Sequence, residues 1–333
     1  YLRFHDDRLG AERPKGARRL LRGVDDLARR DGNARIAAVL FAILFLGSLM
    51  LSDKNVAGSA GFLPHIARID VSGIITDDRK MNELFDKVAK ADQVKAVILD
   101  INSPGGTTTG GEAMYDAIRR LAEKKPVVAV CGTIATSAAY IVALATDRIF
   151  VYGNTITGSV GVIFQWADVT ELLHTLGVKV EEVKSGPLKA VPSPFEPADE
   201  KTLALSQEMV QEAKTWFVNL VAERRKIDPA SVPGLTDGRI YSGRQAVELK
   251  LVDQIGEERD AKTWLSKERN VPSGLKIVDW KPEEESSGLW GWFFHSMTSF
   301  AGISADRILG FLGQVTATLK LDGLVSVWHP ASS

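Results

Sequence analysis

Cysteine and histidine are scarce in this chain of 333 residues, and their scarcity excludes several kinds of site. Cys131 is the only cysteine, which excludes an intrachain disulfide and a zinc centre built from cysteines. Of the five histidines, only His174 lies well inside the central region, and its leucine-rich surroundings favour a structural or surface position. A Ser-His-Asp triad therefore has little support. No motif in the chain calls for a metal or another cofactor.

An excess of one charge is also missing, since the formal net charge is -1. Such a chain has no strong field to attract nucleic acid, and its central region has no basic stripe interleaved with aromatic residues. We therefore expect no nucleic-acid partner. Hydrophobic residues at 45% and charged residues at 25% are the proportions of a folded globular protein.

The charge is unevenly placed, because residues 1–35 hold ten Lys or Arg against six Asp or Glu. The next sixteen residues, Ile36–Leu51, carry no charge and would form a helix of roughly 24 Å. We interpret residues 36–52 as a single transmembrane anchor, and the positive-inside rule keeps residues 1–35 in the cytoplasm. The alternative is a signal peptide cleaved near Ala57–Ala60, although a 35-residue charged leader is long for one.

Residues 53–64 form a short linker, after which strand and helix signals alternate over residues 65–282. This alternation is typical of an α/β domain with a parallel sheet. The expected strands are His65–Thr76, Val94–Asn102, Val127–Val130, Arg148–Val151, Val178–Val183 and Leu275–Trp280. The expected helices are Lys80–Ala91, Gly111–Lys124, Ser137–Thr146, Val169–Leu176, Asp199–Lys226, Ser242–Lys250 and Asp260–Lys267. Residues 283–333 form a separate aromatic and amphipathic tail that contacts the membrane interface, another subunit or the domain itself.

Two segments that follow strands carry candidate chemistry. Ser103-Pro104-Gly105-Gly106 follows the second strand, where glycines let backbone N–H groups point into a cleft as an oxyanion hole does. An ordinary turn is the competing interpretation of this segment. Ser137 falls where the next strand passes into a helix, which is the position of a nucleophile or of a helix N-cap. The chain lacks the G-x-S-x-G elbow of the α/β-hydrolases.

Activation of a serine needs a base, and without a suitable histidine a lysine is the next candidate. Its pKa must fall from about 10.4 toward 7–8, which requires an apolar pocket. Lys184 and Lys189 follow the expected strand Val178–Val183. The sequence neighbours of Lys189 include Leu188, Ala190 and Val191. The residues alone leave both lysines open.

Five ordered motifs between about residues 65 and 280 resemble the signal peptide peptidase A family, in its short, single-repeat form. The motifs are Ser103–Gly106, Thr136–Tyr140, Thr157–Val162, Lys184–Lys189, and Tyr241–Ala246 with Leu251–Gly256. The resemblance implies a Clp-protease/crotonase-like α/β fold with a repeated β-β-α core, behind one transmembrane helix. It also implies a serine-lysine dyad.

The resemblance assigns roles to individual residues of these motifs. Ser137 matches the family's nucleophile, Lys189 its general base and Ser159 the serine that orients the lysine, so Lys184 becomes a bystander. Gly106 and Ala138 match the oxyanion hole, and the substrate is expected to lie against Gly105, Gly158 and Val160. One departure is Ala138-Ala139, where the family commonly has two glycines. The added methyl group is expected to narrow the cleft beside the scissile bond.

The resemblance also implies how such a protein works. It implies a membrane-anchored serine endopeptidase that cleaves remnant signal peptides and other short or unfolded peptides through an acyl-enzyme. The site would lie on the extracytoplasmic side of the bacterial inner membrane, in a homo-oligomeric ring whose subunits share each dyad. The rival interpretations are an inactive membrane-tethered scaffold or chaperone of the same fold, and a crotonase-type acyl-CoA enzyme.

Overall fold

The computed structural model describes residues 63–282 and 325–327. The expected cytoplasmic segment and anchor, residues 1–52, and nearly all of the linker and the tail lie outside these described residues. Within the described residues, no helix is both long enough and apolar enough to cross a membrane.

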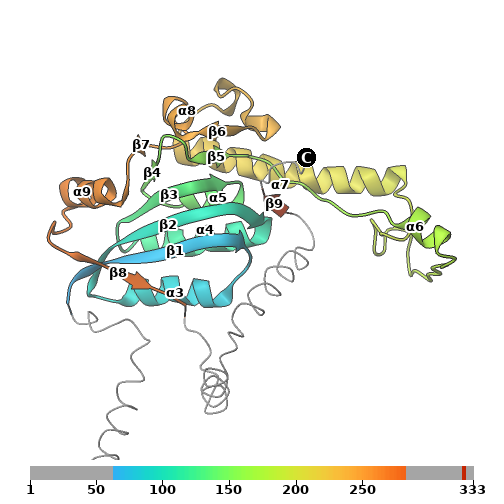
Figure 1. Cartoon of the computed structure of the whole chain (residues 1–333), viewed down its shortest axis with the longest axis horizontal. Helices are drawn as coiled ribbons and strands as arrows, with labels where there is room; N and C mark the ends of the chain where they lie inside the picture. Colours follow the sequence, from blue (N-terminus) through green and yellow to red (C-terminus); the bar gives the residue numbers. More distant parts are fainter. Residues whose placement is uncertain (1–62, 283–324, 328–333) are drawn as a thin grey trace, which may run out of the picture. The chain divides into compact units, whose positions relative to one another are not determined.

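A mixed sheet forms the centre of the described chain (Figure 1). Its strands run in the order β6-β5-β3-β2-β1-β8, β4 pairs with β3 and β7, and β9 pairs with β2. All of these pairings are parallel except β5 with β6 and β2 with β9. The strands are β1 (His65–Ile75), β2 (Val94–Thr107), β3 (Val127–Thr136), β4 (Arg148–Val151), β5 (Ile156–Gly158), β6 (Ile240–Ser242), β7 (Gln254–Ile255), β8 (Lys276–Trp280) and β9 (Val325–Val327).

Helices cover both faces of the sheet. They are α3 (Arg79–Lys90), α4 (Thr108–Ala122), α5 (Ala138–Leu144), α6 (Thr170–Thr175), α7 (Glu200–Arg225), α8 (Gly243–Glu248) and α9 (Glu258–Arg269), with 3-10 turns at Pro229–Ser231 and Leu235–Asp237. Alternate residues of β2 point to opposite faces, so Val97, Leu99 and Ile101 join one core while Ala96 and Ile98 join the other. The first core contains buried residues of α3, α4, α5 and α7, and the second contains those of α9.

The end of β2 corrects one prediction from the sequence. Ser103–Gly106 was expected to follow a strand that stops at Asn102, but β2 continues through these residues to Thr107. The strand persists because β1 still pairs with it, through Ile74 with Gly105 and Ile75 with Gly106. The approach is so close that a Cβ on Gly106 would lie 1.7 Å from the Ile75 carbonyl oxygen. Glycine is needed here for backbone contact between strands, and no turn is formed.

The three long strands carry interruptions midway. The register between β1 and β2 shifts between Ser72 and Ile74, on either side of Gly73, whose φ is 70°. The strand expected to stop at Val130 continues as β3 to Thr136, pairing first with β4 and then with β5. The described part of the chain therefore begins with three pairs of elements, β1-α3, β2-α4 and β3-α5, in which one long, interrupted strand is followed by a helix. The expected repeat was two strands followed by a helix.

Residues 164–198 form an arm that carries α6 and extends away from the sheet (Figure 1). The strand expected at Val178–Val183 is wrong, since the segment has no regular structure. Its valines are exposed, with Val183 fully so. Strand propensity forms no strand here because the segment lacks both a sheet edge to pair with and a core in which to bury its valines.

Candidate functional site

Ser137 occupies a strained turn between β3 and α5. Its φ is 59° and its ψ is -122°, a left-handed conformation that costs a serine about 1–3 kcal/mol. It is the N-cap residue of α5, which begins at Ala138, one position after the expected helix start, and its side chain makes no capping hydrogen bond. The competing interpretation, a serine present only to cap a helix, therefore fails. Strain of this kind is typical of a residue held in place for function.

Pairing between β3 and β5 brings Ser159 next to this turn. Thr136, the last residue of β3, pairs with Gly158, the last residue of β5, so that the two serines follow neighbouring parallel strands. The Ser137 N–H donates to the Gly158 carbonyl at 2.9 Å, and the Ser159 N–H donates to the Arg239 carbonyl at 2.9 Å. Ser159 also has a positive φ, 53°. Backbone hydrogen bonds thus hold both serines in place, and both serines line the same cavity.

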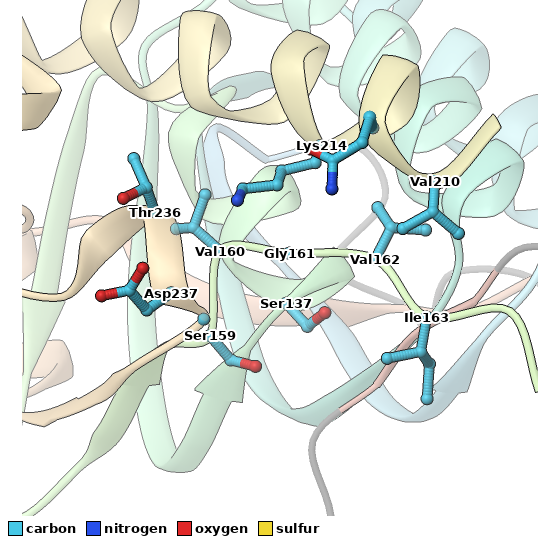
Figure 2. Close-up of a pocket in the computed structure, with 12 residues that line it drawn as sticks. Ser137, Ser159, Val160, Gly161, Val162, Ile163, Val210, Lys214, Thr236 and Asp237 are labelled. Atoms are coloured by element: carbon cyan, nitrogen blue, oxygen red, sulfur yellow. The ribbon is translucent and has the colours of Figure 1, made fainter. Parts of the chain in front are cut away.

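A cavity of about 420 Å³ opens beside the two serines. One wall is the chain after β5, the opposite wall is α7, and the 3-10 turn before β6 closes one side (Figure 2). The lining residues are Ser137, Ser159, Val160, Gly161, Val162, Ile163, Val210, Gln211, Lys214, Thr236, Asp237 and Gly238. The cavity has an apolar side of valines and isoleucine that suits a peptide side chain.

The end of β2 lies beside the same turn. Ser103 pairs with Ala135 of β3, and the Thr136 hydroxyl donates to the Pro104 carbonyl at 3.0 Å. These contacts tie the segment that contains Gly105 and Gly106 to the residue just before Ser137. Gly105 has a φ of 113°, and Gly106 is buried. The Ala138 N–H belongs to the first turn of α5, where N–H groups have no acceptor within the helix. The expected oxyanion donors are therefore neighbours of the serine, from two different elements.

The methyl group of Ala138 faces away from the cavity. Ala138 is fully buried in the main core. A Cβ built on Gly111 of α4 would lie 3.1 Å from the Ala138 Cβ. The methyl group thus packs against α4, and the expectation that it narrows the cleft is wrong. Helices α4 and α5 approach closely here because both contribute small residues.

The two candidate lysines lie in the arm, and neither lines the cavity. Lys184 is paired with Glu196 and, at 3.0 Å, with Glu182, and these carboxylates raise the pKa of Lys184 above its ordinary value. A raised pKa keeps the ammonium charged, which is the wrong condition for a base. Lys189 is exposed, and so is its neighbour Leu188. One chain alone does not provide Lys189 with the apolar pocket that a lysine base requires.

Lys214 is a cavity residue that the sequence analysis missed. It projects from α7 toward Val160 and Thr236 (Figure 2). Its spacing offered a signal, because Val210 and Phe217 place Lys214 on a helical stripe where an apolar residue is expected. Asp237 was missed as well, since it lies in a turn that has no recognisable motif.

Cys131 and His174, which were also considered for a chemical role, do not line the cavity. Cys131 is buried in β3, and burial raises the pKa of its thiol to about 12, so it is an inert core residue. His174 was expected at a structural or surface position, and it is exposed on α6.

Two families match parts of the chain. Residues 119–272, which include Ser137, Ser159, Lys184 and Lys189, match peptidase family S49. Residues 66–155, which include Gly105 and Gly106, match the Clp protease family. This second match agrees with the α/β architecture and mixed sheet described above.

Individual relatives extend these matches over most of the chain. A putative protease of Methanocaldococcus jannaschii is 36% identical over 70% of this chain and 73% of its own length. A putative signal peptide peptidase SppA of Enterococcus faecium is 32% identical over 80% of this chain and 81% of its own. Among solved structures, a ClpP1 variant of Listeria monocytogenes is 18% identical with a TM-score of 0.39, over 58% of this chain and 92% of its own.

Replacing Ala138 with glycine should lower the free energy of unfolding by about 1 kcal/mol, because it removes a buried methyl group. It should not alter which peptides are cleaved, because that methyl group faces α4. Val162→Ala is the matched control, since Val162 lines the cavity and its truncation should change the ratio of kcat/KM between peptides with small and bulky side chains. Denaturation curves and peptide kinetics measure both effects. A change of preference in Ala138→Gly as large as in Val162→Ala would contradict this placement of the methyl group.

Proposed function

The chain belongs to peptidase family S49 as a signal peptide peptidase A-like protease, and we propose that it is a membrane-anchored serine endopeptidase with Ser137 as nucleophile and Lys189 as general base. The observation that carries the proposal is the strained N-cap position of Ser137 in the cavity wall, where its hydroxyl does not cap the helix. The substrates are remnant signal peptides and other short or unfolded peptides.

The proposed reaction proceeds through an acyl-enzyme. Neutral Lys189 accepts the proton of the Ser137 hydroxyl as Oγ attacks the peptide carbonyl carbon. The N–H groups of Gly106 and Ala138 stabilise the resulting oxyanion. The lysine ammonium then gives its proton to the departing amine, and a water molecule hydrolyses the acyl-enzyme. Ser159 holds the lysine amine in position throughout.

Lys189 is proposed to come from a neighbouring copy of the chain. Its own arm extends away from the sheet, and the lysine is exposed there (Figure 1). The arm of one copy laid against the cavity of the next would remove Lys189 from water, which favours its neutral form. In a closed ring, every cavity receives the arm of one neighbouring copy, and every arm contacts the cavity of the next copy.

Lys214 is a second candidate base, favoured by one observation. It lines the same cavity as Ser137 within a single chain, which Lys189 does not. A base from α7 would need no neighbouring copy. This alternative therefore predicts an active monomer, whereas the shared dyad predicts activity only in the assembly.

The membrane location is part of the proposal. Residues 36–52 would anchor the chain in the bacterial inner membrane, with residues 1–35 in the cytoplasm and the peptidase domain on the extracytoplasmic side. A peptidase held at that surface meets remnant signal peptides where they are left in the membrane. An inactive scaffold or a crotonase-type enzyme would not need a strained serine in the cavity wall, whereas a serine peptidase uses it as the nucleophile.

Lysine variants should separate the candidate bases. Lys189→Ala is expected to lower kcat by about 10²–10⁴-fold, the usual worth of a general base, while Lys184→Ala and Lys214→Ala stay within about tenfold of wild type. Circular dichroism checks that each variant folds. Loss of activity in Lys214→Ala together with an active Lys189→Ala would identify Lys214 as the base and reject Lys189.

Mixed assemblies should show whether the dyad is shared. Ser137→Ala and Lys189→Ala chains are each inactive, but co-expressed they should regain about a quarter of wild-type activity, because random mixing rebuilds an intact pair at one interface in four. The activity per chain of the purified mixture measures this recovery. The matched control combines Ser137→Ala with a Ser137→Ala, Lys189→Ala double variant, which rebuilds no pair. A mixture as inactive as this control would mean that each dyad lies within one chain.

A further inference from the structure

Buried hydroxyl groups hold the peptide unit between Pro104 and Gly105 at both of its ends. The Thr136 hydroxyl donates to the Pro104 carbonyl at 3.0 Å. At the other end, the Gly105 N–H donates to the Ser103 hydroxyl at 3.1 Å, and this hydroxyl in turn donates to the Gly73 carbonyl at 2.6 Å. Ser103 and Thr136 are both fully buried. The peptide unit, which belongs to β2, is therefore tied to both neighbouring strands, β1 and β3 (Figure 1).

This peptide unit directly precedes two glycines whose backbone has little steric restraint of its own. Gly105 has a φ of 113°, which residues with a side chain rarely adopt, and Gly106 has no room for a Cβ because the backbone of β1 lies against it. Glycine provides that conformation and that space, but it also lets the peptide between the two residues rotate at little steric cost. That peptide carries the Gly106 N–H, the proposed oxyanion donor, so the surrounding structure has to fix its orientation.

The two hydroxyls fix the backbone just ahead of Gly105. The pyrrolidine ring of Pro104 sets its φ, and the hydroxyls hold the plane of the peptide that follows. Only the two torsions of Gly105 then separate this plane from the Gly106 N–H, and pairing with β1 restrains them. Thr136 is also the residue directly before Ser137. The bond from its hydroxyl thus links the nucleophile's strand to the strand that carries the oxyanion donor.

We propose that Ser103 and Thr136 are positioning residues of the oxyanion hole: their hydroxyls lock the Pro104–Gly105 peptide and so hold the Gly106 N–H where the oxyanion develops. Neither side chain lines the cavity, so both act through the backbone. A donor that is already oriented stabilises the transition state without reorganisation, provided that it is held within about 0.5 Å of the productive geometry. The catalytic role of the lock rests on the proposed peptidase function, whereas the lock itself does not.

Variants that remove either hydroxyl should lower kcat and leave KM unchanged, because the oxyanion exists only in the transition state and the intermediate. Thr136→Val keeps the shape of the side chain, and Ser103→Ala removes a single heavy atom. Each should lower kcat about tenfold, which is less than the roughly 10²–10³-fold cost of deleting an oxyanion donor outright. Thr136→Ser retains the hydroxyl and should stay within about twofold of wild type. An unchanged kcat in both Thr136→Val and Ser103→Ala overturns the proposal.

Thr155→Val is the matched control for the loss of a buried hydroxyl. Thr155 is buried, and its hydroxyl donates to the Gly132 carbonyl of β3 at 2.7 Å and accepts from the Tyr152 N–H at 2.9 Å. The control therefore loses bonds of the same kind beside the same strand, without touching the locked peptide. Its kcat should equal that of wild type. A fall in kcat as large as in Thr136→Val would mean that any such loss disturbs the site, and would reject the positioning role.

Hydrogen exchange tests the lock without catalysis. In full chains that carry Ser137→Ala, mass spectrometry compares amide exchange in residues 103–107 with and without Thr136→Val or Ser103→Ala. Exchange should be at least about threefold faster in both variants and unchanged in Thr155→Val, because only the first two free the locked peptide. If exchange is faster but even the wild-type chain hydrolyses no peptide, the lock stands and only the peptidase proposal fails. Unchanged exchange alongside normal wild-type hydrolysis would reject the lock alone.

Discussion

The proposed chemistry depends on a backbone conformation that serine rarely adopts. At Ser137 the chain takes a positive φ, and the pairing of β3 with β5 holds it there through the bond from the Ser137 N–H to the Gly158 carbonyl. Helix α5 begins at the next residue, and its buried Tyr140 donates to the Leu251 carbonyl at 2.6 Å, which ties the helix to the second half of the domain. The cost of the turn is offset by this surrounding structure, and the hydroxyl is presented at the cavity instead of capping the helix.

The same core does not provide a base in an apolar pocket. The sheet and the helices packed on it position Ser137, Ser159, Gly106 and Ala138, whereas Lys189 lies on an exposed arm. Under the proposal that Lys189 of a neighbouring copy completes the site, activity depends on assembly.

Much of this arrangement could be predicted from local patterns. The alternation of strands and helices follows hydrophobic periodicity, and every helix expected between residues 65 and 282 is present. The position of Ser137 between a strand and a helix was predicted in the same way, whereas Ser159 was assigned only through the family resemblance. Local sequence patterns gave wrong predictions where pairing with a distant segment decides whether a strand forms. Gly105 and Gly106 look like a turn but are paired with β1, and Val178–Val183 looks like a strand but has no partner.

Other features required the three-dimensional arrangement itself. Lys214 and Asp237 join the cavity only because α7 and the turn before β6 pack beside Ser137. The direction of the Ala138 methyl group depends on how α4 approaches α5, and strand β9 depends on contact between segments more than two hundred residues apart. Apart from the helical spacing of Lys214, nothing in the sequence encodes these contacts, because they arise when separate elements pack together.

Ser137 as the covalent nucleophile is the central claim, and an acyl-enzyme trapped during turnover tests it most directly. Chains mixed with a peptide ester, quenched in acid within the first turnovers and digested for mass spectrometry should carry the acyl group on Ser137. Ser137→Ala chains should carry none. An acyl group on Ser159 or on another residue, or hydrolysis that persists in Ser137→Ala without any adduct, would contradict the account.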